Sequence, residues 1–115
     1  MPSEYLTLVA ALKALNIPFE EYAWQTRPEG AYGVVSLDME ESSEDGDDRK
    51  LDRVWEASVD VFFYLLTERE AIMQAVEGVL TEVCGNSWEL NSAQYENQTR
   101  LFHYEWTCRV MDAEV

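Results

Sequence analysis

A two-residue alternation near the middle of the chain constrains the fold more than any other feature of the sequence. From Trp55 to Leu65 every odd-numbered position is apolar, and Glu56, Ser58 and Asp60 stand between them. Successive side chains of a β-strand point to opposite faces of the sheet. The segment therefore predicts a long strand with one face in a core and the other face polar.

The polar face of this predicted strand turns apolar at its end, where the sequence places Phe62, Tyr64 and Leu66. A strand that is apolar on both faces needs cover on both sides, from a helix or from another subunit. We therefore take these three residues as the candidate subunit contact.

Two segments carry the spacing of amphipathic helices. In the first, apolar residues recur three or four positions apart after the expected N-cap Ser3, and Pro18 sets an end near Asn16. The second is expected to open on a capping box from Thr67 to Glu70 and to stop at Gly85. The first stripe consists of Tyr5, Leu6, Val9, Leu12 and Leu15, and the second of Ala71, Ile72, Ala75, Val76, Val79, Leu80 and Val83.

Four further segments are typical of strands: Phe19–Trp24, Ala31–Met39, Ser87–Tyr95 and Leu101–Met111. With 115 residues, of which 47% are hydrophobic, the chain can form one core. We predict a single α+β domain over residues 1–115, in the order α-β-β-β-α-β-β. Its two helices pack on a mixed or antiparallel sheet of about five strands.

An acidic segment from Asp38 to Asp52 is the strongest compositional bias in the chain. Eight acids against two bases give it a net charge of −6, and Asp45-Gly46 suits a two-residue hairpin turn. We predict that it forms the projecting part of a hairpin between the second and third strands. Its candidate interface or channel residues are Asp38, Glu40, Glu41, Glu44, Asp45, Asp47, Asp48 and Asp52.

Residues that carry catalysis or hold metals are sparse. His103 is the only histidine and is expected to be a solvated strand residue, while Cys84 and Cys108 fit two reduced, buried thiols. The acidic segment matches a calcium-binding EF-hand poorly. An EF-hand loop begins with Asp and ends with Glu, whereas the matching positions here are Glu41 and Asp52. Glu56, Asp60 and Glu105 are expected to share a solvated sheet face. We predict neither an enzyme, nor a metal site, nor a cofactor.

The charge of the whole chain limits its partners. Eight Lys and Arg against 23 Asp and Glu give −15, which repels nucleic acid and anionic lipid. The start of the chain also lacks the pattern of a signal peptide, so we expect a soluble protein made in the cytoplasm. Two specific interpretations remain open beside plain solubility: an acidic surface that stays clear of DNA, or one that imitates DNA in a basic groove of another protein.

The order of these segments resembles the small tail-terminator and tail-completion proteins of long-tailed bacteriophages. The resemblance begins at Leu12–Phe19, which has the pattern Leu-x-x-Leu-x-Ile-Pro, and continues with the aromatic stretch Tyr22–Trp24. A Pro/Gly turn and the β-rich segment Tyr32–Val35 follow, and then the polar hairpin, a strand, a helix and two closing strands. It covers almost the whole chain.

The resemblance implies a structural virion protein, found in the tail or neck and assembled in the cytoplasm of a bacterial host. Its subunits would form a ring, expected to be a hexamer, that caps the tail tube and meets the head-side connector protein. DNA would be a cargo passing through an acidic channel, and no membrane would be involved. The alternative function is an acidic DNA mimic that inhibits a nucleic-acid-binding protein.

Overall fold

A computed structural model describes residues 2–41 and 53–112 of the chain, and the order of its elements is the predicted one. The elements are α1 (Ser3–Lys13), β1 (Phe19–Glu21), β2 (Tyr32–Glu41), β3 (Arg53–Phe63), a 3-10 turn (Leu66–Glu68), α2 (Arg69–Cys84), β4 (Trp88–Glu96) and β5 (Leu101–Asp112). The prediction of an α+β fold with two helices and five strands is confirmed.

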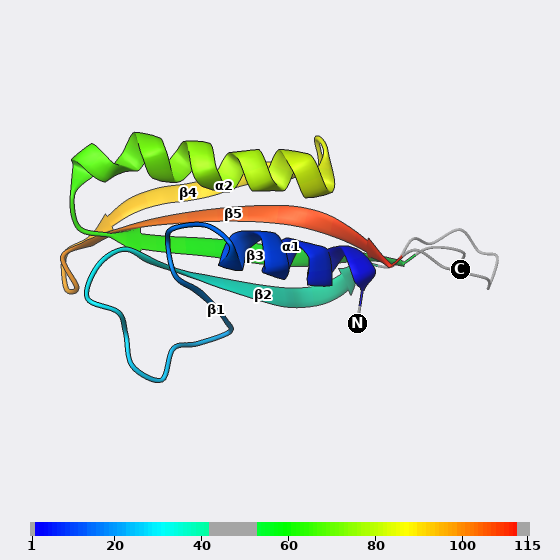
Figure 1. Cartoon of the computed structure of the whole chain (residues 1–115), viewed down its shortest axis with the longest axis horizontal. Helices are drawn as coiled ribbons and strands as arrows, with labels where there is room; N and C mark the ends of the chain where they lie inside the picture. The colour runs from blue at the N-terminus through cyan, green and yellow to red at the C-terminus, as the bar shows by residue number, and fades with distance from the viewer. Residues whose placement is uncertain (1, 42–52, 113–115) are drawn as a thin grey trace.

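The strands form one mixed sheet in the order β1-β2-β3-β5-β4 (Figure 1). β1 runs parallel to β2, and the other neighbours are antiparallel. β2 and β3 are therefore adjacent and antiparallel, as the predicted hairpin requires. Most of its projecting part, residues 42–52, lies outside the described residues.

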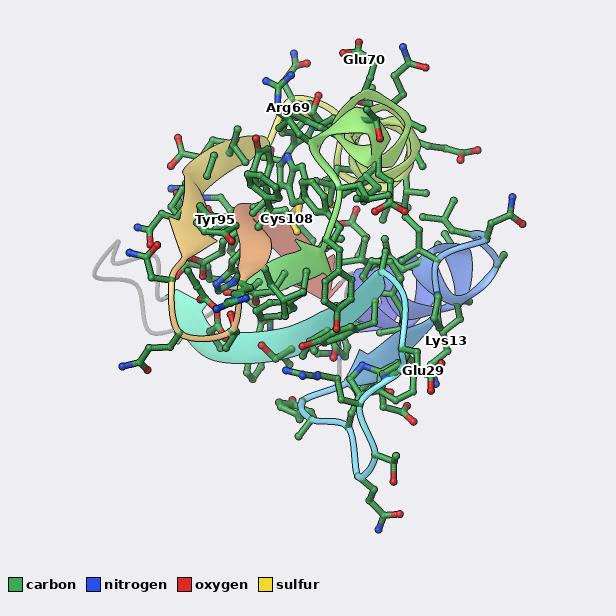
Figure 2. The ribbon with its side chains drawn as sticks, turned by 90° about the vertical axis from the view of Figure 1, so that its left-hand side faces the viewer. Lys13, Glu29, Arg69, Glu70, Tyr95 and Cys108 are labelled. Carbon is green, nitrogen blue, oxygen red and sulfur yellow. The ribbon has the colours of Figure 1, made fainter. Side chains whose placement is uncertain are left out.

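Both helices lie on one side of the sheet, which curves around them (Figure 2). The core forms between this helix-covered face and the buried sides of α1 and α2. Its largest fully buried side chain is Trp106 of β5. Among the described residues, no helix is both long enough and apolar enough to cross a membrane.

The close packing of β1 on the sheet depends on a glycine. Gly33 of β2 stands opposite Phe19 of β1 in the parallel register, and a Cβ on Gly33 would collide with the Phe19 ring. Tyr22 then takes a positive φ of 66°, which turns the chain away from the strand direction. β1 therefore ends at Glu21, three residues before the predicted end of this strand.

Several details of the predicted helices are wrong. α1 begins at Ser3 itself, with Pro2 in place of the expected N-cap, and it ends at Lys13 rather than near Asn16. The buried residues of α1 are Tyr5, Leu8, Val9 and Leu12, which recur three or four positions apart. Leu6 points about 100° away from its neighbour Tyr5 and is 54% exposed. α2 is preceded by a 3-10 turn instead of a Thr67 capping box. There the Glu68 carboxylate accepts a hydrogen bond of 3.3 Å from the backbone N–H of Leu65. Gly85 does end α2, with a φ of 63°.

The candidate subunit contact does not form one strand face. β3 ends at Phe63, the chain bends at Tyr64, and Leu66 belongs to the 3-10 turn that leads into α2. Phe62 lies on the helix-free face of the sheet, while Tyr64 and Leu66 are exposed in the connection. The alternation continued past the strand because the turn happens to be apolar as well.

Candidate functional site

The helix-free face of the sheet gathers polar side chains from four strands, and we refer to it as the open face. In the β3–β5 register Asp60 stands opposite Glu105 and Glu56 opposite Arg109, which confirms that the three predicted acids share a face. β-bulges interrupt the register of β2 at Asp38 and of β4 at Asn91. On β2, β3, β4 and β5 the described carboxylates of the open face include Asp38, Glu56, Asp60, Glu89, Glu96 and Glu105.

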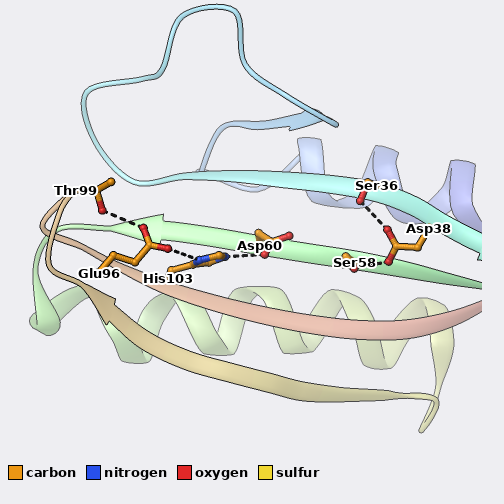
Figure 3. Close-up of polar contacts among 7 residues, drawn as sticks. All are labelled: Ser36, Asp38, Ser58, Asp60, Glu96, Thr99 and His103. Carbon is orange, nitrogen blue, oxygen red and sulfur yellow. Dashed lines mark hydrogen bonds and ion pairs between the residues drawn. The ribbon is translucent and has the colours of Figure 1, made fainter.

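The most ordered polar cluster on the open face is centred on His103 of β5 (Figure 3). Its Nε2 lies 2.7 Å from Oδ1 of Asp60 on β3, and its Nδ1 lies 2.9 Å from Oε2 of Glu96 at the end of β4. Thr99 in the following turn donates a hydrogen bond of 3.0 Å to the other oxygen of Glu96. We call the arrangement of Asp60, His103 and Glu96 the histidine clasp.

The geometry of the clasp favours the protonated form of its histidine. A carboxylate only accepts hydrogen bonds, so both ring nitrogens donate when both contacts are made, and the ring is then an imidazolium. The hydrogen bond to Asp60 raises the pKa of His103 above 6.5, with a further contribution from Glu96 and against the effect of burial. The bond from His103 likewise lowers the pKa of Glu96 below 4.5. The expectation of a solvated histidine is wrong.

An aromatic row continues from the clasp across the open face. The His103 ring stacks on Phe62 of β3 with centroids 4.2 Å apart, and Phe62 stacks on Tyr32 of β2 at 5.0 Å. Trp24 then meets Tyr32 edge to face, and its Nε1 donates a hydrogen bond of 3.0 Å to the carbonyl of Gly33. The row holds the loop before β2 against the sheet, and it lies apart from the main core.

The two carboxylates of the clasp engage both nitrogens of the His103 ring. Both nitrogens of His103 are occupied by carboxylates, so the ring has no free lone pair with which to take a proton from a substrate. Burial and then Asp60 raise the pKa of Glu105, which stands opposite Asp60 of β3 and Ser92 of β4. Within residues 2–41 and 53–112 no group of three His, Cys, Asp or Glu side chains could hold a metal ion.

The end of β2 at Glu41 divides the candidate interface residues of the acidic segment into two groups. Asp38, Glu40 and Glu41 belong to β2. Asp38 lies on the sheet rather than in a projection, and its carboxylate accepts hydrogen bonds from Ser36 and Ser58. Glu44, Asp45, Asp47, Asp48 and Asp52 lie outside the described residues.

Both cysteines are free thiols, as expected, but only one of them is fully buried. Cys108 of β5 lies in the core, while Cys84 at the end of α2 is half-buried. A hydrogen bond with Cys108 lowers the pKa of Cys84, and the same bond together with burial raises the pKa of Cys108.

The sequence contains no local signal for the clasp. His103 is separated from Asp60 by 43 positions and from Glu96 by seven, so only the register of β3, β4 and β5 brings them together. The polar positions of β3 and β5 were predicted, but which of them would stand side by side was not.

Comparison with known proteins adds no relative: no family model matches the chain, and no curated protein matches it.

Proposed function

We propose that this chain is a structural assembly protein of a phage tail, the ring subunit that caps the tail tube and joins it to the head-side connector. The observation that carries the proposal is the order of elements, α-β-β-β-α-β-β, because the resemblance to tail-terminator proteins rests on this order. A fold alone hosts many functions, so the proposal needs a test of assembly.

Two surfaces of the described chain support an assembly role. Tyr64, Leu65 and Leu66 form an exposed apolar connection between β3 and α2, which is the kind of surface that a neighbouring subunit covers. The open face supplies the acidic surface that would let DNA pass without sticking. The histidine clasp contributes by fixing the end of β4 to the middle of the sheet.

The first experiment measures association directly. Native mass spectrometry and light scattering of the purified chain should show a ring, and electron microscopy should show it on the end of tail tubes made from the same phage genome. A strict monomer at every concentration, together with no binding to tail tubes or to the connector, would refute the proposal.

A pair of variants tests the apolar connection. Tyr64→Ser combined with Leu66→Ser should abolish the ring while the melting temperature of the monomer stays nearly unchanged, because both side chains are exposed. Leu6→Ser is the matched control, since Leu6 is 54% exposed and Leu66 is 59% exposed, and it should assemble normally. Equal assembly of both variants would remove the connection from the interface.

The acidic open face also favours the second candidate, a DNA mimic. Carboxylates spread over β2, β3, β4 and β5 present negative charge without nucleic acid, which a basic groove would bind. This function requires salt-sensitive capture of a nucleic-acid enzyme by the monomer. Recovery of no such enzyme at low salt would eliminate it.

A further inference from the structure

No strand in the described part of the chain pairs with the outer edge of β4. β4 spans nine residues, is the last strand of the sheet, and pairs with β5 alone among the described strands. Figure 1 shows it along the outer side of β5. A strand in this position directs N–H and C=O groups outward at alternate residues, and these can pair with another strand.

Little in the sequence of β4 protects this edge. Edge strands are commonly kept short or carry lysine or proline, and β1 at the other end of the sheet follows this rule with three residues. β4 contains neither lysine nor proline. Its one irregularity is the bulge at Asn91, between Leu90 and Ser92.

The two sides of β4 differ in chemistry. On the helix-covered side Leu90 and Tyr95 are large apolar side chains left exposed beside the edge. On the open side stand Glu89 and Glu96, and the bulge is the reason that these two residues, an odd number of positions apart, share one side. A depression of about 370 Å³ at the start of the strand is lined by Trp88, Glu89, Glu56 and Arg109, among others.

We propose that β4 receives an extended strand of another protein, in which apolar residues alternate with lysine or arginine. Main-chain hydrogen bonds would extend the sheet, the apolar residues would cover Leu90 and Tyr95, and the basic residues would lie beside Glu89 on the open side. The inference goes beyond the proposed function, because the edge has this chemistry whether or not the protein belongs to a tail.

Charge decides between a partner protein and a second copy of this chain. Each copy carries −15, and a second β4 would bring its own glutamates against an open face that is already acidic. A basic strand would instead be attracted by the net charge of the chain and would place lysine or arginine beside the glutamates of β4. The pKa of Glu105, raised by burial and by neighbouring carboxylates, marks the same excess of negative charge on this face.

The test uses the full chain and synthetic peptides. The probe is a nine-residue peptide that alternates lysine and valine, and the control has the same composition with all lysines first. Calorimetry should show at least tenfold weaker binding of the control, because a peptide with all its lysines in sequence cannot place them all on one side of a strand. NMR should also show that the chemical shifts of backbone amides change most in β4 when the alternating peptide binds. Equal binding of both peptides, shifts outside β4, or no binding would overturn the proposal.

Two charge-matched variants complete the test. Glu89→Lys should weaken binding of the alternating peptide at least fivefold, whereas Glu29→Lys, in the exposed loop before β2, should leave binding unchanged. Both substitutions change the net charge equally, so equal weakening would show that only the overall charge matters and would contradict docking at β4.

Discussion

Replacement of His103 by phenylalanine gives the sharpest test of the histidine clasp. His103→Phe keeps a ring that can stack on Phe62 but removes both hydrogen-bond donors and the positive charge. Asp60 and Glu96 then lose their partner while they remain partly shielded from water. We expect the variant to fold, but with a lower free energy of unfolding at mildly acidic pH.

The exposure of the three side chains sets the size of the loss. A buried hydrogen bond to a charged group contributes about 1.5–3 kcal/mol, and an exposed ion pair contributes about 0–1 kcal/mol. His103 is 25% exposed, Asp60 20% and Glu96 34%, which places the clasp between these limits. We expect a total of about 1.5 kcal/mol, or a fall of about 6 °C in the melting temperature of a domain of this length.

The pH dependence has a definite sign. The folded pKa of His103 is raised, so its contribution is complete below the unfolded value of 6.5 and is lost as the pH rises through the folded pKa. The folded pKa of Glu96 is lowered, so its contribution is complete above 4.5 and is lost as the pH falls through that lower pKa. The difference between wild type and variant should therefore be largest between pH 4.5 and 6.5 and should shrink in alkali.

Chemical denaturation at several pH values measures this difference, and Gln94→Ala is the control, because Gln94 stands exposed opposite His103 in the β4–β5 register. NMR gives the pKa itself without ambiguity, since the chain has one histidine. Asp60→Asn should lower that pKa more than Glu96→Gln does, in line with the larger effect of Asp60. A midpoint at or below 6.5, or the same loss of stability in acid and alkali, would refute the reasoning.

Other parts of the fold give three further predictions. Gly33→Ala should cost about 1–3 kcal/mol in a urea melt, because its Cβ would meet the Phe19 ring; no loss would show that β1 is loosely held. Gly78→Ala in α2 should instead raise the free energy of unfolding by about 0.5–1 kcal/mol, since the new Cβ meets no other atom; destabilisation would show that this side of α2 is not open. Mass spectrometry after brief alkylation of the folded protein should show one adduct, at Cys84, and modification of Cys108 first would be inconsistent with their burial.

The long elements could be predicted because their evidence is local. The alternation from Trp55 onward and the apolar stripe of α2 repeat over many residues, and each repeat reports the same buried side. The ends were less predictable. Apolar residues at Tyr64 and Leu66 continued the strand pattern into a turn, and Tyr22 ended β1 by its backbone angle rather than by its composition.

The site could be predicted only in part, because it depends on register. The sequence assigns Asp60 and His103 to polar strand faces, but a slip of two residues between β3 and β5 would preserve every face and separate the pair. Trp24, which the sequence pattern places only at the end of a strand, packs against Tyr32 and outside the main core. Contacts of this kind are fixed by the whole sheet rather than by any segment.

The extra residue at Asn91 gives β4 a spare position. Leu90 and Ser92 already stand opposite the consecutive residues Trp106 and Glu105, so deletion of Asn91 would remove the bulge and leave the other side chains of the strand on their present sides. A strand that took Asn91 into its regular alternation would instead turn Glu96 away from His103 and Tyr95 toward the acids. Related chains should therefore be able to lose the residue at this position while they keep the clasp.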